Sequence, residues 1–330
     1  MLKQFSGNSD LIFYLFVMSI TFLITRFTVR WLIEKMKVKG IVGLDMNKET
    51  RPSIPEMGGI SVIIGFFMGI YTEIFFFEMY GLGNEINTYI LCSIVTAIGI
   101  GFVGIIDDLI GVRQSIKALL PFVFALPLGF FVSSVMLLPI VGKYDFGFMM
   151  LFLVPFAITC ASNSTNMLEG FNGLSTGLCI IISICLCFMA VISNEKDGLY
   201  LLVPLLGSLL SFWFYNKYPA KIFPGDTLTM FMGCVIACAA ISSNLRLEGL
   251  ILLSPMILEF FFKLRGRFSA QSFATDIKEG ILIYDKEIQS LTHVLMVNFK
   301  LTERGLVNVF LIIETILGLF LCILTYLEWL

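Results

Sequence analysis

Histidine and charge are scarce in this chain of 330 residues. His293 is the single histidine, and Asp, Glu, Lys and Arg together make up 14% of the sequence, against about 25% in a typical soluble domain. Hydrophobic residues reach 58%. Because His293 is flanked by apolar residues, it is more typical of a packed or interfacial side chain than of a catalytic one. The composition argues against an ordinary soluble protein.

Several nucleotide and metal motifs are also absent. The sequence contains no Walker A motif and no GxGxxG that opens a helix after a strand. All eight cysteines lie in apolar stretches, as Cys185 and Cys187 do, and no pair has the spacing or context of zinc ligands or of a disulfide framework. We interpret them as small buried hydrophobic side chains, and we expect no nucleic-acid partner.

The hydrophobic residues fall in blocks of the length that spans a bilayer, about 17–25 residues. Strands would require the alternating pattern of a barrel, which is missing. The sequence therefore predicts an all-α polytopic membrane protein with about ten transmembrane helices, forming a single integral-membrane domain over residues 1–330. The predicted blocks are 10–33, 58–79, 88–106, 116–140, 147–162, 171–193, 198–214, 227–244, 247–264 and 305–327.

Basic residues sort by loop. With both termini on the non-cytoplasmic side, the external loops carry few basic residues and the cytoplasmic loops carry most of them, as the positive-inside rule requires. The two longest loops, 34–57 and 265–304, are then cytoplasmic, and loops held by a rigid scaffold are where function concentrates. Within the second loop, 287–297 is expected to form a short amphipathic helix at the membrane surface.

The first polar cluster is GIIDDLIGVRQSIK, which contains Asp107, Asp108 and Lys117. Two adjacent carboxylates at the C-terminal end of a helix oppose its dipole and repel each other. Stability alone does not ask for them, so we expect cation binding or proton transfer. A solvated helix end is the alternative.

The second cluster is NSTNMLEGFNGLSTG, in which Asn163, Asn166, Glu169 and Asn172 recur every three residues. Part of this stripe can share one helical face. Polar side chains at this depth usually face a cavity or each other. Hydrogen bonding between helices is the alternative.

The third cluster, NKYPAKIFPGDTLTMFMG, places Asp226 at the start of a predicted span. Asp226 is either an N-cap or a ligand for Mg²⁺, with substrate phosphates completing the coordination shell.

The fourth cluster, KLRGRFSAQSF, contains Arg265 and Arg267. These are either positive-inside anchors or a clamp for phosphate, which arginine binds bidentately.

Together the clusters put acids, amides and cations at one face of the membrane, a combination that suits Mg²⁺ and a diphosphate. A transporter would instead need a polar path across the bilayer, often with internal repeats, and we detect neither. A lipid-binding scaffold would not need paired aspartates.

The segments DDLIGVRQSIK, NSTNMLEGFNGL and NKYPAKIFPGDT, in this order, resemble the polyprenyl-phosphate N-acetylhexosamine-1-phosphate transferases. LDMNKETRPSIPEMGGI, LRGRF and SLTHVLM followed by LTERGL resemble the eukaryotic and archaeal branch, the dolichyl-phosphate N-acetylglucosamine-1-phosphate transferases. The bacterial relatives carry a histidine-rich motif in the last long cytoplasmic loop, and this sequence has none.

The resemblance implies that UDP-N-acetylglucosamine and a polyprenyl or dolichyl phosphate react to give the lipid diphosphate sugar and UMP. It assigns Asp226 and Asn166 to Mg²⁺, for which Mn²⁺ is a substitute. Asp107, Asp108 and Lys117 would act on the acceptor phosphate, and a base role for the aspartates stays open. The substrate-binding residues would be Glu56, Lys48, Asn172, Phe223, Arg265 and Arg267.

The same chemistry with another UDP-N-acetylhexosamine or with undecaprenyl phosphate is an alternative. The resemblance implies a role in N-glycan assembly. The compact last cytoplasmic loop favours an archaeal cell membrane over an endoplasmic reticulum membrane, and a homodimer is compatible with this interpretation.

Overall fold

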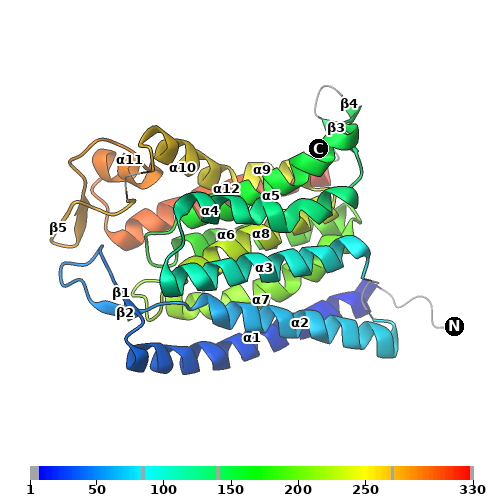
Figure 1. Cartoon of the computed structure of the whole chain (residues 1–330), viewed down its shortest axis with the longest axis horizontal. Coiled ribbons are helices and arrows are strands. Elements are labelled where there is room, and N and C mark those ends of the chain that lie inside the picture. Colours follow the sequence, from blue (N-terminus) through cyan, green and yellow to red (C-terminus); the bar gives the residue numbers. More distant parts are fainter. Residues whose placement is uncertain (1–6, 83–85, 139–141, 269–270, 328–330) are drawn as a thin grey trace.

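The computed structural model describes residues 7–82, 86–138, 142–268 and 271–327. Most of them lie in long helices that run along one axis of the molecule (Figure 1). The helices are α1 (Gly7–Lys39), α2 (Gly59–Tyr80), α3 (Thr88–Ile110), α4 (Gln114–Ala125), η1 (Leu126–Phe130), η2 (Gly147–Met149), α5 (Met150–Met167), α6 (Leu174–Ile192), η3 (Lys196–Gly198), α7 (Leu199–Asn216), α8 (Gly225–Ser242), α9 (Arg246–Leu252), α10 (Ser254–Arg265), α11 (Leu291–Asn298) and α12 (Glu303–Tyr326).

Eight helices in the described part of the chain are long and apolar enough to cross a membrane. They are α1, α2, α3, α5, α6, α7, α8 and α12, and each matches one predicted block. Large apolar side chains on their outer faces are exposed, including Phe27 at 75% and Ile316 at 63%. A soluble protein rarely exposes so much contiguous apolar surface, so the chain is an integral membrane protein.

The two remaining blocks differ from the prediction. Block 116–140 is helical only as far as Phe130, where η1 ends; Pro121 and Pro127 weaken the helix before that point. Block 247–264 is divided into α9 and α10 at Leu253, just before Pro255, which favours the first turn of a new helix.

In the described part of the chain, three small antiparallel hairpins that the hydropathy pattern did not predict extend from the helices. They pair β1 (Val42–Leu44) with β2 (Ser53–Pro55), β3 (Val135–Leu138) with β4 (Gly142–Asp145), and β5 (Asp276–Lys278) with β6 (Ile281–Ile283). The first and third hairpins and α11 lie at one end of the bundle, and the start of α1 and the end of α12 lie at the other (Figure 1). The helix expected over 287–297 is present as α11, over Leu291–Asn298.

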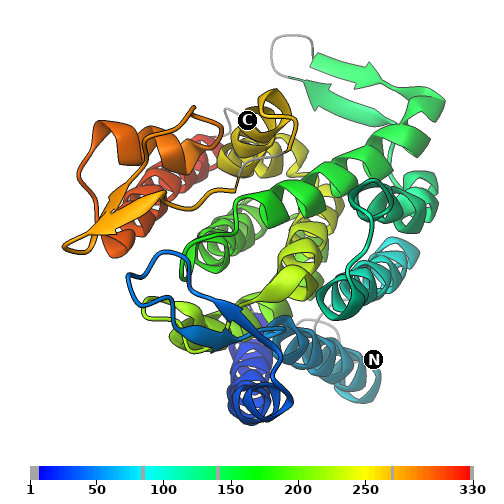
Figure 2. The same cartoon turned by 60° about the vertical axis from the view of Figure 1, so that its left-hand side comes forward.

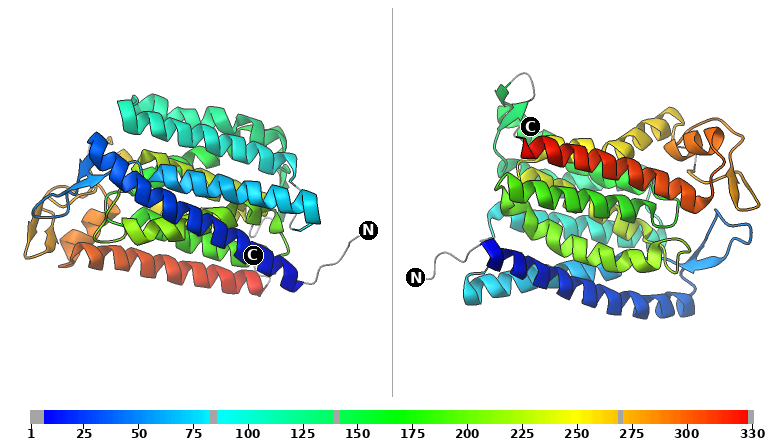
Figure 3. Two further views of the ribbon diagram at one scale, coloured as in Figure 1. Left: turned by 90° about the horizontal axis from the view of Figure 1, so that it is seen from below. Right: turned by 180° about the vertical axis from the view of Figure 1, so that it is seen from behind.

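Helix α8 is the centre of the molecule. In its apolar stretch, 83% of the residues are buried, against 28% for α1 and 39% for α12. Helices α1 and α12 run along the outside of the bundle (Figure 3). Glycines let neighbouring helices approach the start of α8 closely. A Cβ on Gly104 of α3 would lie 2.6 Å from Thr227 Cα, and one on Gly59 of α2 would lie 2.5 Å from Leu228 N.

We expect Gly104→Ala to lower the unfolding temperature in detergent, because the added methyl meets the α8 backbone, and overpacking of this kind costs about 1–3 kcal/mol. Gly101→Ala, one turn earlier on α3, is the matched control. There the nearest atom is the terminal methyl carbon of Ile63 at 3.0 Å, which can move, and no backbone atom is met; the Phe231 ring follows at 3.3 Å. Equal unfolding temperatures for the two variants would show that α3 and α8 do not pack as closely as described.

Candidate active site

The polar clusters of α3, α5 and α8 meet at the end of the bundle that carries the first and third hairpins (Figure 2). At the end of α3, Gly111 adopts φ +70° and its N–H donates to the Asp107 carbonyl at 2.9 Å. Asp107 Oδ1 accepts a hydrogen bond from Val112 N at 2.6 Å. This turn reverses the chain into α4 and brings Lys117 back towards Asp107.

Lys117 lies between two carboxylates. Its Nζ is 2.8 Å from Asp107 Oδ2 and also contacts Asp226 Oδ2. The exposed fractions of the side chains are 6% for Lys117, 12% for Asp107 and 29% for Asp226. One cation therefore faces two anions at a largely buried position, and the excess negative charge opens to solvent at Asp226.

Asn166 completes the surroundings of Asp226. Its Nδ2 donates to Asp226 Oδ1 at 2.7 Å and to Thr229 Oγ1 at 2.8 Å. Asn166 is on the last turn of α5, and Asp226 and Thr229 are on the first turn of α8. The two residues that the sequence assigned to one metal site thus lie side by side.

Asp108 binds the first turn of α8. It accepts hydrogen bonds from Asp226 N at 2.8 Å, Thr227 N at 3.0 Å and Thr227 Oγ1 at 2.6 Å. A carboxylate favours the free N–H groups of a helix start. The capping alternative for Asp226 is therefore wrong: the capping carboxylate comes from α3, and the Asp226 side chain is left to face the site.

Gly225 makes this contact sterically feasible. Its φ is +69°, a backbone conformation that residues with a Cβ atom rarely adopt. A Cβ at this position would also collide with the Asp108 carboxylate. The sequence Gly225–Asp226–Thr227 thus brings two N–H groups and one hydroxyl to Asp108.

The loop before α8 is attached to the first loop, which joins α1 to α2. Phe223 N donates to Pro55 O at 2.8 Å, and Gly58 N donates to Phe223 O at 2.9 Å. Glu56 lies between these contacts. Removal from water, and secondly the negative charge of Asp108, raise the pKa of Glu56 above its ordinary value. Phe223 and Glu56, which the resemblance assigns to substrate binding, therefore lie beside the loop that leads to Asp226.

Lys48 and Asn172 belong to a second cluster. Lys48 Nζ is 3.2 Å from Asp45 Oδ2 and also contacts Glu303 Oε2. Asn172 Nδ2 donates to Asp45 Oδ2 at 2.9 Å, and Asn172 N donates to Glu303 Oε1 at 2.9 Å. Neither Asp45 nor Glu303 was singled out from the sequence; Glu303 reads there as an ordinary acid in the first turn of a helix.

Arg265 and Arg267 are not joined to these clusters. Arg265 pairs with Glu287 at 3.5 Å, with both side chains about two-thirds exposed at 66% and 68%. Among the described residues, no hydrogen bond or ion pair links either arginine to Asp107, Lys117 or Asp226. Both belong to the segment 265–304, and the orange part of this segment lies at the same end of the bundle as the blue first loop (Figure 2).

This segment is anchored by Glu259 of α10, which is fully buried. Its carboxylate accepts hydrogen bonds from Ser290 Oγ at 3.0 Å, Leu291 N at 2.8 Å and Ser272 Oγ at 3.2 Å. The contacts fix the path of the chain around both arginines. A buried carboxylate with several donors is a sound anchor, because each of its oxygens is satisfied.

His293 is packed, as predicted. It is fully buried and its ring stacks on Tyr284 with 3.6 Å between centroids. Its Nε2 lies 3.0 Å from Gln271 O. Removal from water lowers the pKa of His293 to about 4, so the ring is neutral at pH 7.

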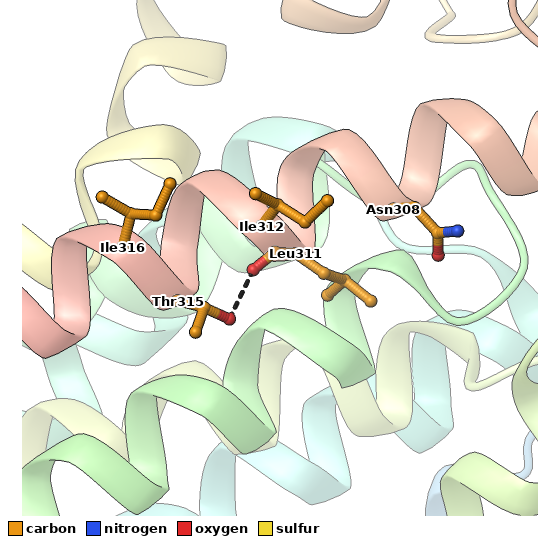
Figure 4. A pocket seen from close by; sticks show the side chains of 5 residues that line it. All are labelled: Asn308, Leu311, Ile312, Thr315 and Ile316. Atoms are coloured by element: carbon orange, nitrogen blue, oxygen red, sulfur yellow. Dashed lines mark hydrogen bonds between the residues drawn. The ribbon is translucent and has the colours of Figure 1, made fainter.

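A groove of about 280 Å³ runs along α12 (Figure 4). It is lined by Leu311, Ile312 and Ile316 with Asn308 and Thr315, and it contains none of the clustered site residues. It lies on a membrane-facing helix and is separate from the candidate site.

Comparison with known proteins places these features in a family. Residues 90–244 match the family described as glycosyl transferase family 4. Over 311 residues, 92% of this chain and 94% of the relative, the sequence is 35% identical to a Saccharolobus solfataricus protein. That protein is provisionally named UDP-N-acetylglucosamine–dolichyl-phosphate N-acetylglucosaminephosphotransferase. The chain belongs to glycosyl transferase family 4.

Two further relatives come from a eukaryote and a bacterium. The Saccharomyces cerevisiae UDP-N-acetylglucosamine–dolichyl-phosphate N-acetylglucosaminephosphotransferase is 28% identical over 271 residues, 68% of this chain and 60% of the yeast protein. A Borrelia garinii phospho-N-acetylmuramoyl-pentapeptide-transferase is 28% identical over 265 residues, 69% of this chain and 72% of the bacterial protein. Most of the site described above lies in the stretch that matches the family.

We expect Lys117→Met to lower the unfolding temperature strongly, because removing one partner of a buried ion pair leaves uncompensated charge and costs about 3–5 kcal/mol. Adding Asp226→Asn should restore part of the loss, since it removes one of the two anions. Exposed Lys221→Met is the matched control. Unchanged stability in Lys117→Met, or no recovery in the double variant, would contradict the described charge arrangement.

Glu169 predicts a pH dependence. It lies after α5, bonded to Ser175 Oγ, and removal from water raises its pKa from 4.5 to about 7. The folded protein thus holds this proton more tightly than the unfolded chain. The contribution to stability is complete below pH 4.5 and is lost as the pH rises through about 7. Glu169→Gln should flatten the unfolding-temperature profile in this window, whereas exposed Glu279→Gln should leave its slope intact. A profile unaltered by Glu169→Gln would refute the assignment.

Proposed function

We propose that this protein transfers N-acetylglucosamine-1-phosphate from UDP-N-acetylglucosamine to a polyprenyl phosphate of the dolichyl type, releasing UMP. The names of the Saccharolobus and yeast relatives support this reaction. In the structure, the observation that supports it is that Lys117 is held between Asp107 and Asp226. This cluster lies at the end of the bundle that carries the first and third hairpins. The product is the first membrane-bound intermediate of N-glycan assembly.

The reaction forms one P–O bond and breaks another. An oxygen of the lipid phosphate attacks the phosphorus that carries the sugar, and UMP leaves with the bridging oxygen. A phosphate monoester has a second pKa of about 6, so the acceptor is largely dianionic at pH 7 and a strong base is not essential. The obstacle is repulsion between two polyanions, and preorganised cations relieve it.

Lys117 is the cation next to the acceptor in this proposal. Because Asp107 and Asp226 hold its ammonium, it needs little reorganisation to meet a phosphate. Asp107 orients Lys117. Asp108 fixes the first turn of α8 and in this way positions Asp226 and Lys117 for the acceptor phosphate.

Mg²⁺ would be held by Asp226 and Asn166, with Mn²⁺ as a substitute. The residues fit: Asp226 is more exposed than Asp107, the other carboxylate that contacts Lys117, and Mg²⁺ is commonly bound by one or two carboxylates with phosphates and waters. Among the described residues, no group of three or more His, Cys, Asp or Glu side chains forms a complete metal cage. When bound, the ion would neutralise phosphate charge.

Donor binding is assigned to the loops. Arg265 and Arg267 would hold the diphosphate, because their exposed guanidinium groups lie on a segment anchored by Glu259. Asn172, Phe223 and Glu56 would contact the nucleoside and neighbouring groups. Lys48, engaged by two carboxylates, would support this wall of the site.

The proposed topology has ten spans, with α4–η1 and α9–α10 as the two that each consist of two short helices. Both termini would face the non-cytoplasmic side, and the site would face the cytoplasm, where UDP-sugars are made. The similarity to archaeal proteins favours the cell membrane as the location.

We expect purified protein in detergent to release UMP from UDP-N-acetylglucosamine only when polyprenyl phosphate and Mg²⁺ are both present, and EDTA should stop release. Asp226→Asn keeps the shape of the side chain but weakens metal binding, so its turnover should fall at least about a hundredfold. UMP would be measured by a coupled assay, with a donor panel that includes a UDP-N-acetylmuramoyl-peptide.

Folded wild-type protein that releases no UMP across donors and lipids would refute the transferase assignment. Asp226→Asn with normal turnover and normal Mg²⁺ dependence would remove Asp226 from the metal site while leaving the reaction in place.

A further inference from the structure

Four side chains from three separate segments form a closed polar ring. Asp45 and Lys48 come from the first cytoplasmic loop, Asn172 from the turn between α5 and α6, and Glu303 from the first turn of α12. The links run from Asp45 to Lys48 and from Asp45 to Asn172, and from Glu303 to Lys48 and to the backbone of Asn172. We call these four residues the Asn172 ring.

The ring is largely shielded from water. Asp45, Asn172 and Glu303 are 4%, 4% and 3% exposed, and the Lys48 side chain is 18% exposed. With two carboxylates around one ammonium, Lys48 is already neutralised. Lys48 thus acts here as a cross-link between the first loop and the start of α12.

The ring decides which way the Asn172 amide points. A carboxylate can only accept hydrogen bonds, so the Asn172 atom that faces Asp45 must be the NH₂ nitrogen, and Oδ1 points away. Among the described residues no hydrogen bond to Oδ1 is found, while Nδ2 is engaged by Asp45. Oδ1 is therefore an acceptor that a ligand can use.

Neighbouring contacts join the Asn172 ring to the segments that carry Asp226 and Asn166. Lys48 Nζ lies 4.3 Å from the centre of the Tyr218 ring, at the start of the loop that leads to Phe223 and Asp226. On the other side, Asn47 Nδ2 donates to Gly170 O at 2.7 Å, which ties the first loop to the α5–α6 turn. The Asn172 ring thus lies where the first loop, the α5–α6 turn and the loop before α8 meet.

We propose that Asp45 and Glu303 are positioning residues that fix the Asn172 oxygen as an acceptor for an N–H or O–H donor of the nucleotide sugar. This inference rests on the proposed function. Two parts of that substrate offer the required donor: the N3–H of uracil and a hydroxyl of ribose or of the sugar. Cytosine has a bare N3 acceptor, so UDP and CDP distinguish the sources.

The test uses the full-length protein in detergent, with UDP and CDP affinities measured by calorimetry and with KM and kcat for both substrates. Asp45→Asn keeps the shape but lets the Asn172 amide turn over. Its KM for UDP-N-acetylglucosamine should rise about tenfold, the effect of one lost hydrogen bond. Its kcat and its KM for polyprenyl phosphate should stay near those of the wild type. Exposed Asp285→Asn is the matched control, and Glu303→Gln is the second variant should Asp45→Asn fail to fold.

If the ratio of UDP affinity to CDP affinity is smaller in Asp45→Asn than in the wild type, the inference is supported and uracil N3–H is the donor. Equal losses for UDP and CDP would support it with a hydroxyl as the donor. Unchanged affinity and KM in folded variants would overturn the inference alone, as would equal losses in kcat and in both KM values, which indicate general damage. Wild-type protein that neither binds UDP nor releases UMP would refute the proposed function as well.

Discussion

The bond between Asp108 and the first turn of α8 is the interaction on which the candidate site depends. Helix α8 is the most enclosed of the candidate spans, so its N-terminal N–H groups have little access to water and need a partner inside the protein. Asp108 satisfies two of them and the Thr227 hydroxyl. Because α3 provides this partner, the end of α3 and the start of α8 are fixed together. Asp107, the neighbour of Asp108, and Asp226, whose own N–H is one of the bonded groups, are thereby held on either side of Lys117.

Paired aspartates at a helix end are unfavourable if they do the same work, but here they have separate roles. Both carboxylate oxygens of Asp108 accept hydrogen bonds from α8. Asp107 instead contacts Lys117 and accepts a hydrogen bond from the backbone N–H of Val112. The repulsion between them is offset by a helix start for one and an ammonium for the other. What remains is the carboxylate of Asp226, and its excess charge at the open side suits a cation that arrives together with phosphate groups.

Hydropathy and the position of polar residues predicted much of this arrangement. Asp107, Lys117, Asn166 and Asp226 stand out in the sequence because polar groups in apolar blocks need a reason to be there, and the structure brings them together. The partner of Asp108 was not predictable, since an N–H at the start of a distant helix leaves no mark on the local sequence. Asp45 and Glu303 were missed for the same reason: each looks like an ordinary loop or helix-start acid until the folded chain places both beside Lys48. The β3–β4 hairpin was missed because its apolar strand continues the hydropathy of block 116–140.

In the proposed reaction, the surroundings of Lys117 would let one site accept a water-soluble donor and a lipid acceptor. On α4, Ile116 and Leu119 on either side of Lys117 are 50% and 61% exposed, so this helix presents apolar surface to the bilayer beside the buried ammonium. A phosphate carried on an isoprenoid chain can therefore approach Lys117 while its tail stays in lipid. The loops with Asn172, Phe223, Arg265 and Arg267 lie at the same end of the bundle but outside the apolar spans, where the proposed reaction would take its nucleotide sugar from water. In that reaction the positions of α4 and of these loops would separate the two substrates by solubility, and Asp226 would lie at the boundary where their phosphates meet.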